Sequence, residues 1–335
     1  MVTTKVSQMP SPLYSVLICD TPLQLVSCLN ALTQMRSSNF DILCAGDLIR
    51  EPCTRLKELP FFKEHIVFVP SKDVTTVPTQ VKCKAYEASI TQVLSFYPTP
   101  LTMSVVNFDK YSTALYLLED GVFSYLPFYT QSFIEQCNFV TGLTVYEPKL
   151  MTYQAPCPVL RFKPLVEGST CLDWLRVAYS TPERPVYDNE WLWVDCNFKH
   201  SHYVECVVDS FRRECERQGG TFVRRLHPKQ DPTLYKSEGV HLELSNGVPL
   251  EVEFLLGRPL PKRFGTLSSS SAIYYALMCR KEVVPTDFYI ECVTGHLHEL
   301  VEPWFNVDTL QAVTKFIRSY CDLYPETLTY HTSIS

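Results

Sequence analysis

Glycine is scarce in this sequence, and the loops built from it are missing. The chain holds 11 glycines in 335 residues, and they form neither a G-x-G-x-x-G stretch nor a G-x-x-x-x-G-K-[ST] loop. Such loops let the backbone approach a pyrophosphate closely, and they mark dinucleotide-binding enzymes and P-loop kinases. The G-x-S-x-G turn that presents a serine nucleophile is also absent. The sequence therefore argues against these enzyme classes.

Long apolar runs and basic clusters are missing as well. No run of about 18 apolar residues exists, so no membrane-spanning helix is expected. Residues 1–12 have no apolar core, so no signal peptide is expected. The net charge of −6 and the pI of about 5.8 argue against a nucleic-acid partner. The 14 cysteines are scattered, which favours reduced thiols in a cytoplasmic protein.

The chain is longer than the usual single core, which favours two domains. Apolar runs alternate with helical patterns, which indicates α/β domains with parallel sheets. We expect a first domain over 13–165, a linker over 166–188, a second domain over 189–305 and a terminal helix over 306–325. The strands are expected at 15–19, 41–45, 65–69, 103–108, 114–118, 191–196, 221–226, 240–244 and 288–293, and helices at 86–96 and 201–218.

Three polar positions interrupt the apolar stretch from 224 to 277. His227-Pro228 ends a strand pattern, Glu251 lies in a second apolar segment, and the four serines at 268–271 begin a helical pattern. Free N–H groups and hydroxyls at a helix start suit an oxyanion. A histidine at a strand end can stabilise a departing phosphate. These residues predict a nucleotide-phosphate site, although each also has a structural interpretation as a helix cap or a core side chain.

Two further motifs lie in the first half of the chain. Thr21, Pro22 and Gln24 follow an apolar strand and fit a helix cap, with Gln24 completing a capping box. Glu119-Asp120-Gly121 follows another strand, where open α/β sheets place ligands and where glycine permits a sharp turn. The alternatives are a cap with no further role for the first motif and an acidic surface turn for the second.

In this order, the motifs resemble the bacterial-type sialyltransferases with a GT-B fold, which include lipooligosaccharide sialyltransferases and polysialyltransferases. The resemblance covers about residues 14–280. It implies two Rossmann-like domains whose parallel sheets face a central cleft. It also implies an inverting enzyme that transfers sialic acid, or a related nonulosonic acid, from a CMP-sugar to a glycan hydroxyl. The alternatives are a glycosyltransferase with another nucleotide sugar and a non-catalytic nucleotide- or glycan-binding protein of the same fold.

The resemblance also assigns roles to residues. Asp120 would be the general base with Glu119 as its neighbour, and His227 would stabilise the leaving CMP phosphate. Glu251 would hold the ribose. Glu251 and Glu253 alternate as on a strand and would face opposite ways, with Glu253 in solvent. The remaining substrate-binding positions are Thr21, Pro22, Gln24, Gly121, Pro228, Ser268, Ser269 and Ser270. Arg224, Arg225 and Lys229 are the candidates for pairing with the donor carboxylate, without support from a motif.

No metal and no resident cofactor are expected. The sequence has no Asp-x-Asp, the motif with which GT-A glycosyltransferases hold a metal on a diphosphate. Cys196, His200, His202 and Cys206 are zinc-ligand types, but their spacing matches no common zinc module. The expected partners are a CMP-sugar donor and an oligosaccharide or glycolipid acceptor. A glycolipid would bring the protein to a membrane surface peripherally, and a homodimer is compatible with this interpretation.

Overall fold

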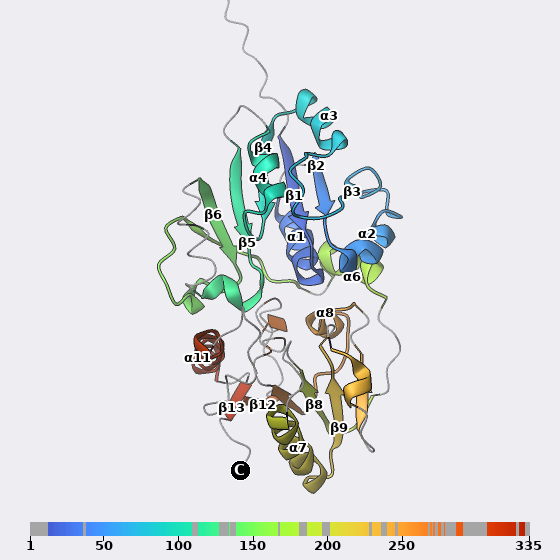
Figure 1. Ribbon diagram of the computed structural model, residues 1–335, viewed down its shortest axis with the longest axis vertical. Helices are drawn as coiled ribbons and strands as arrows, with labels where there is room; N and C mark the ends of the chain where they lie inside the picture. Colours follow the sequence, from blue (N-terminus) through green and yellow to red (C-terminus); the bar gives the residue numbers. More distant parts are fainter. Residues whose placement is uncertain are drawn as a thin grey trace, which may run out of the picture. The chain divides into compact units, whose positions relative to one another are not determined.

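The computed structural model describes most of the chain. The described residues are 13–35, 38–108, 113–126, 134, 139–166, 168–180, 186–195, 202–227, 230–235, 240–244, 247–266, 269, 271, 274–275, 278, 286–290, 307–325 and 328–331. Within these ranges, no helix combines the length and the apolar character that crossing a bilayer requires. Two sheets organise these residues (Figure 1).

The first sheet has seven strands in the order β3-β2-β1-β4-β5-β6-β7, and all neighbours pair in parallel. Its strands are β1 (Tyr14–Cys19), β2 (Phe40–Cys44), β3 (Ile66–Phe68), β4 (Ile90–Ser95), β5 (Ala114–Leu118), β6 (Val140–Val145) and β7 (Val159–Arg161). Its helices are α1 (Pro22–Gln34), α2 (Arg50–Leu56), α3 (Thr79–Glu87) and α4 (Pro100–Val106). β1 is buried along its whole length, as expected for a central parallel strand.

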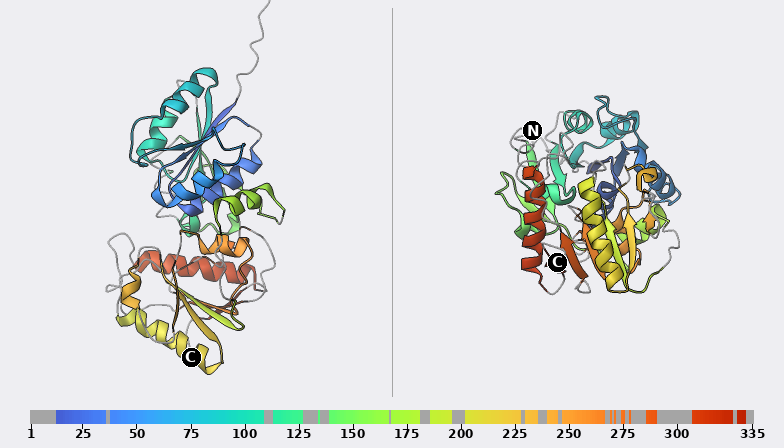
Figure 2. Two further views of the ribbon diagram at one scale, coloured as in Figure 1. Left: turned by 90° about the vertical axis from the view of Figure 1, so that its right-hand side faces the viewer. Right: turned by 60° about the horizontal axis from the view of Figure 1, so that its bottom comes forward.

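The second sheet has six strands in the order β10-β9-β8-β11-β12-β13, again all parallel. Its strands are β8 (Glu190–Val194), β9 (Thr221–Arg225), β10 (His241–Glu243), β11 (Arg263–Thr266), β12 (Thr286–Ile290) and β13 (Leu328–His331). The helices that come after β7 in the chain are α6 (Thr170–Ala178), α7 (His202–Arg217), α8 (Leu250–Leu255) and α11 (Val307–Leu323). α7 runs beside β8 and β9 (Figure 2), and its Phe211 ring packs against Trp191 and Trp193 at 5.2 and 5.5 Å.

The chain divides into two compact units, each built on one sheet. The first unit holds residues up to Asp120, Pro127–Pro148 and Gln154–Lys163, and the second holds Gly121–Leu126, Lys149–Tyr153 and Pro164–Ser335. Two short segments of the expected first domain therefore belong to the second unit. One of them is the 3₁₀ helix η2 (Gly121–Tyr125), against which the terminal helix α11 packs, with the rings of Tyr125 and Phe316 5.0 Å apart. The expected linker contains helix α6.

Three sequence-based predictions of elements are wrong. Residues 103–108 were expected as a strand and lie mostly in α4, because Thr99 caps a helix start with Pro100 at its first position. Residues 86–96 were expected as a helix, whereas α3 ends at Glu87 and β4 follows. The segment of Glu251 and Glu253 was expected as a strand and forms α8. In each case a short apolar run fits either period, and the tertiary environment decides.

Four buried cysteines gather on one side of the first sheet. Cys19 and Cys44 end β1 and β2, while Cys28 and Cys53 come from α1 and α2. Every cysteine that the structure describes is a free thiol, and the Sγ atoms of Cys44 and Cys53 lie 2.9 Å apart. These four residues fill the core as small apolar side chains.

Gly46 lies where two backbone segments approach closely. A Cβ atom at this position would lie 1.9 Å from the carbonyl oxygen of Asp20 and 2.7 Å from its carbonyl carbon. Only glycine fits such a contact, because the clashing atoms are backbone and cannot rotate away. Gly46 therefore fixes the loop after β2 against the residue that follows β1.

We expect Gly46→Ala to destabilise the protein by about 3 kcal/mol, the upper part of the range for overpacking. Gly142→Ala is the control, since its nearest neighbour would be a Tyr116 ring atom at 3.2 Å, which can move. Urea unfolding of both variants checks this. Equal losses of unfolding free energy in the two variants would contradict the close approach at Gly46.

Candidate functional site

The first sheet changes its winding direction between β1 and β4. From β1 the chain proceeds to β2 and β3 on one side, and from β4 it proceeds to β5, β6 and β7 on the other. In open parallel sheets, ligands bind outside the carboxyl ends of the strands at such a switch point. Asp20 directly follows β1, and Tyr97 comes two residues after the end of β4. The two residues therefore mark the expected ligand position of this unit.

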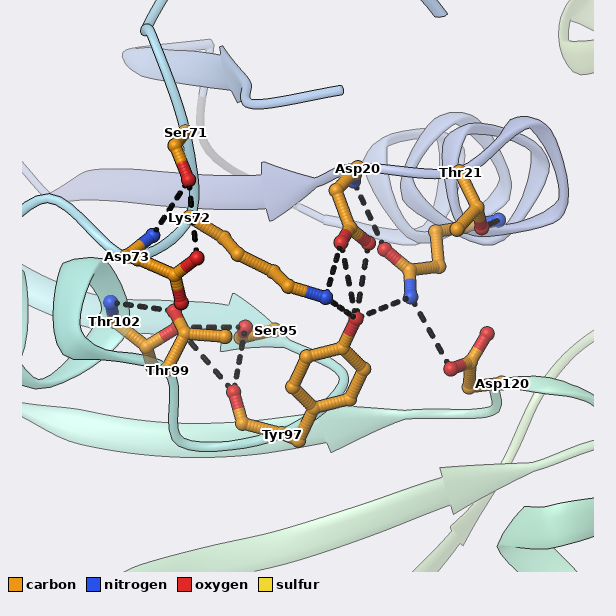
Figure 3. A network of polar contacts seen from close by, with 11 residues as sticks. Asp20, Thr21, Ser71, Lys72, Asp73, Ser95, Tyr97, Thr99, Thr102 and Asp120 are labelled. Carbon is orange, nitrogen blue, oxygen red and sulfur yellow. Dashed lines mark hydrogen bonds and ion pairs between the residues drawn. The ribbon is translucent and has the colours of Figure 1, made fainter. Parts of the chain in front are cut away.

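Asp20, Tyr97 and Lys72 form a compact polar cluster (Figure 3). The Tyr97 hydroxyl donates to the Asp20 carboxylate, with 3.1 Å to each oxygen. Lys72 Nζ lies 2.9 Å from Asp20 Oδ2 and donates to the Tyr97 hydroxyl at 3.1 Å. The backbone of Lys72 is itself fixed, because its carbonyl accepts from the Leu101 N–H at 3.0 Å. The carboxyl ends of β1, β3 and β4 thus converge on one ion pair.

Gln24 connects this cluster to the start of α1. Thr21 is the N-cap, Pro22 begins the helix, and the Thr21 hydroxyl accepts from the Gln24 N–H at 3.3 Å, so the predicted cap is confirmed. The predicted capping box is wrong in one detail. The Gln24 Oε1 atom accepts from the N–H of Asp20 at 2.9 Å rather than from that of Thr21. This orientation directs the amide nitrogen of Gln24 toward Tyr97 at 3.5 Å and Asp120 at 3.1 Å.

Asp120 is the member of the cluster whose carboxyl pKa is raised toward neutrality. The pKa of its carboxyl is raised to about 6 as the net result of four effects: burial raises it most, the hydrogen bond from Gln24 lowers it, the charge of Asp20 raises it, and the charge of Lys72 lowers it. A carboxylate with a pKa near 6 is ionised at neutral pH and still basic enough to accept a proton. Gly121, the next residue, has a φ of 74°, which confirms the expected sharp turn.

Glu119 does not supply the second carboxylate that the sequence suggested. Its side chain is 1% exposed, and its Oε2 atom accepts from the Tyr146 N–H at 2.6 Å. Its carbonyl accepts from the Ser27 hydroxyl at 3.1 Å. Glu119 therefore ties the end of β5 to α1 and to the end of β6, while Asp20 is the carboxylate that raises the pKa of Asp120.

A hollow of about 180 Å³, part of it open solvent space, lies against the cluster. Asp20, Gln24, Lys72 and Tyr97 are among its lining residues, whereas Thr21 and Pro22 are not. Lys72 and Tyr97 are residues of this cluster that the sequence did not predict. Each residue comes shortly after a strand, and this position could have identified it as a site residue. For Tyr97, the wrong prediction of a helix over 86–96 hid the strand that precedes it.

In the second unit, His227 stands at the carboxyl end of β9. Its N–H donates to Gln230 Oε1 at 2.7 Å, and its carbonyl accepts from the Gln230 N–H at 2.9 Å. The Gln230 amide donates to the Tyr235 hydroxyl at 3.0 Å, and the guanidinium of Arg224 lies 4.5 Å from the centre of the Tyr235 ring. The backbone at His227 is therefore held in a fixed turn after the strand.

Glu251 and the serine run meet in this unit. Glu251 lies in the first turn of α8 and is 9% exposed. Burial raises the pKa of its carboxyl, and a hydrogen bond with Ser271 acts in the opposite sense. The hydroxyls of Ser269 and Ser271 are 3.1 Å apart, and the Ser269 N–H donates to Thr266 at the end of β11. Ser268, Ser270 and Pro228 lie outside the described residues.

Two arginines expected near a donor carboxylate are committed to internal ion pairs. Arg224 is 4% exposed and lies 2.8 Å from both Asp195 and Glu205. Arg225 is 3% exposed and lies 2.9 Å from Glu253. The structure thus contradicts the expectation that Arg224 or Arg225 is available to pair with the donor carboxylate. Lys229, the third candidate, lies outside the described residues. The carboxylate at hydrogen-bonding distance from each arginine offsets the cost of removing its charge from water.

Glu253 was expected in solvent and is instead buried. It is 2% exposed and also lies 2.9 Å from Arg258, which bridges to Glu190 at 3.0 Å.

The described residues contain no group of three or more His, Cys, Asp or Glu side chains placed to hold a metal ion. Cys196 and His200 lie outside the described residues.

Comparisons with solved structures show the same architecture in other proteins. The α/β-galactoside α-2,3-sialyltransferase of Photobacterium phosphoreum matches with a TM-score of 0.60 at 11% identity, covering 96% of this chain and 98% of that chain. The GT-B domain of the Photobacterium damselae sialyltransferase matches with a TM-score of 0.53 at 11% identity, covering 95% and 99%. The chain has a GT-B-like fold.

This fold is shared with enzymes of other chemistry. A putative UDP-N-acetylglucosamine 2-epimerase of Listeria monocytogenes matches with a TM-score of 0.54 at 12% identity, covering 95% of this chain and 90% of that chain. No protein-family model matches the sequence, and the curated proteins contain no match to it. The expected GT-B-like fold and the expected resemblance to bacterial sialyltransferases are therefore confirmed at the level of structure.

The buried ion pairs of the second unit give a stability prediction. Glu253→Gln should lower the free energy of unfolding by about 3 kcal/mol, because Arg225 and Arg258 would lose a buried counter-charge. Glu51→Gln, at a carboxylate that is 74% exposed beside Arg55, should cost less than about 1 kcal/mol. Chemical denaturation at neutral pH measures both, and similar small losses would show that the Glu253 pair contributes little.

Proposed function

We propose that the chain is an inverting glycosyltransferase. It moves sialic acid, or a related nonulosonic acid, from a CMP-sugar donor to a hydroxyl of an oligosaccharide or glycolipid acceptor. The observation that carries the proposal is Asp120, a carboxyl with a pKa of about 6 that follows β5. It accepts a hydrogen bond from Gln24, which lines the hollow at the switch point of the parallel sheet. Such a group suits a general base that works near neutral pH.

Asp120 accepts the proton of the acceptor hydroxyl in the proposed reaction. The acceptor oxygen then bonds to the anomeric carbon, and the bond from that carbon to the CMP phosphate breaks. A single displacement with one carboxylate base inverts the anomeric configuration. Asp20, rather than Glu119, is the acidic neighbour that keeps Asp120 basic.

The second unit is proposed to hold the donor. Glu251 binds the cytidine ribose, and the serines at 268–271 with His227 stabilise the phosphate as negative charge develops on it. Glu251 and Ser271 are already in contact, which supports their placement in one site. A monophosphate leaving group needs no metal clamp when protein donors neutralise it, so the proposed reaction is metal-independent.

The similar solved structures include two bacterial sialyltransferases, which supports the choice of donor. A UDP-sugar enzyme is the second candidate. A UDP-N-acetylglucosamine 2-epimerase of Neisseria meningitidis, solved with UDP-N-acetylglucosamine bound, has a TM-score of 0.51 against this chain. Asp120 favours the transfer reaction, because a transferase must deprotonate an acceptor hydroxyl.

Nucleotide binding separates the two candidates. CMP at about 100 times its dissociation constant should add about 2.7 kcal/mol to the unfolding free energy, visible as a rise in melting temperature. UDP should give a smaller rise, and EDTA should leave the CMP effect and the transfer rate unchanged. A larger effect of UDP, or a strict requirement for a divalent cation, would favour the UDP-sugar enzyme.

Asp120→Asn separates chemistry from donor binding. It keeps size and polarity but removes the proton acceptor, so transfer should fall by roughly 10²–10⁴-fold. CMP affinity, measured by calorimetry, should stay nearly unchanged because the proposed donor residues all belong to the second unit. Asp47→Asn, at a fully exposed carboxylate, is the matched control and should retain full transfer. Full transfer by Asp120→Asn would remove Asp120 as the base.

A further inference from the structure

Gln24 is a buried amide whose two ends have different partners. It is 1% exposed, so its side chain belongs to the interior of the first unit. Its Oε1 atom accepts from the Asp20 N–H at 2.9 Å, and its Nε2 atom donates to Asp120 at 3.1 Å and to the Tyr97 hydroxyl at 3.5 Å. Turning the amide over would place a carbonyl oxygen against a carboxylate, so its orientation is fixed.

The Tyr97 hydroxyl is equally constrained. Its hydrogen goes to Asp20, and its oxygen accepts from Lys72 at 3.1 Å and from Gln24. A phenol has one hydrogen to donate, so these contacts use its donor and both acceptor positions. The pKa of Lys72 reflects the same cluster: burial lowers it, but the contacts with Asp20 and Tyr97 raise it further, so Lys72 stays charged. The ion pair thus supports a hydrogen-bond chain that ends on Asp120.

We propose that Gln24, Tyr97 and the Asp20–Lys72 ion pair are positioning residues that hold the Asp120 carboxylate and set its affinity for a proton. The role assigned to Asp120 rests on the proposed function. The arrangement itself does not depend on it. In this assignment Gln24 acts through Asp120. The substrate-binding role expected for Gln24 from the sequence is withdrawn, because its amide is buried and engaged on both sides.

Asp20 and Lys72 carry opposite charges, so they shift the pKa of Asp120 in opposite directions. Among the described residues, the groups that face Asp120 are Asp20 after β1, Gln24 in α1, Lys72 after β3 and Tyr97 after β4. Removing the negative charge of Asp20 favours ionisation of Asp120, whereas removing the positive charge of Lys72 disfavours it. Removing the Gln24 amide also disfavours ionisation, because the carboxylate loses a hydrogen bond. If these residues only stabilised the fold, their substitution would not shift the pKa of Asp120 in opposite directions.

The test is a direct titration of Asp120 in the full chain. Protein with ¹³C-labelled aspartate carboxyls is titrated by NMR, and the Asp120 resonance is assigned by its loss in Asp120→Asn. We expect Asp20→Asn to lower the pKa of Asp120, and Lys72→Met and Gln24→Ala to raise it, each by about half a unit or more. Tyr97→Phe removes only the hydroxyl and should move the pKa without a change of charge. Asp47→Asn and Lys63→Met, at exposed positions, are the matched charge controls and should move nothing.

The pH profile of kcat/KM for sugar transfer is the second measurement. The acidic limb of this profile should move with the Asp120 pKa measured by NMR. It should move to lower pH in Asp20→Asn and to higher pH in Lys72→Met. Shifts of the same sign in these two variants, or no shift in variants with wild-type melting temperature, would overturn the proposal. If Asp20→Asn fails to fold, the rise in the Asp120 pKa expected for Lys72→Met and Gln24→Ala decides alone, and an unmoved Asp120 pKa in both variants rejects the proposal.

The two proposals fail in different ways. The NMR titration needs no substrate, so it reports on the positioning residues even if the chain transfers no sugar. Opposed shifts together with full transfer by Asp120→Asn would uphold the positioning and reject the general base. Absent shifts together with lost transfer in Asp120→Asn would reject the positioning and uphold the base.

Discussion

Parallel strand pairing is the constraint on which both units depend. Every strand neighbour in the two sheets pairs in parallel, so each chain segment must cross over before it can return. All carboxyl ends of a sheet then lie at one edge, and the loops that leave them collect there. Asp20, Lys72, Tyr97 and Asp120 follow four different strands of the first sheet, and they meet because that edge is shared. The polar cluster is thus a consequence of topology.

Buried charge is the second theme of the structure, and it differs between the arginine pairs of the second unit and the Asp20–Lys72 cluster of the first. In the second unit, Arg224, Arg225 and Arg258 are each surrounded by carboxylates, and these pairs connect strands to helices. In the first unit, one lysine stands between Asp20 and Tyr97, and a further carboxyl, Asp120, lies next to them. Burial, together with that local excess of acid, keeps the pKa of Asp120 high. Removing one partner of a matched buried pair leaves an uncompensated charge, so the fold depends on both partners, whereas a partly matched carboxyl has a shifted pKa of the kind found at functional sites.

Much of the architecture could be predicted from the chain. The long buried runs predicted β1, β2 and β9 to within two residues, and the Thr21-Pro22 cap placed the start of α1. The position of Asp120 after β5 and the turn at Gly121 also followed from local pattern. Short apolar runs gave the errors: residues 103–108 and the α8 segment suit either a strand or a helix until their packing is known.

The sequence by itself determined which segments are buried strands, where helices begin, and that Asp120 stands at the end of a strand. These properties depend on residues close together in the chain, through side-chain period and capping. Only the tertiary structure decided which carboxylate neighbours Asp120, that Glu119, Glu253, Arg224 and Arg225 are interior residues, and that Lys72 and Tyr97 belong to the cluster. Each of these contacts joins positions on different strands or helices, and strand order, which local sequence does not encode, brings them together.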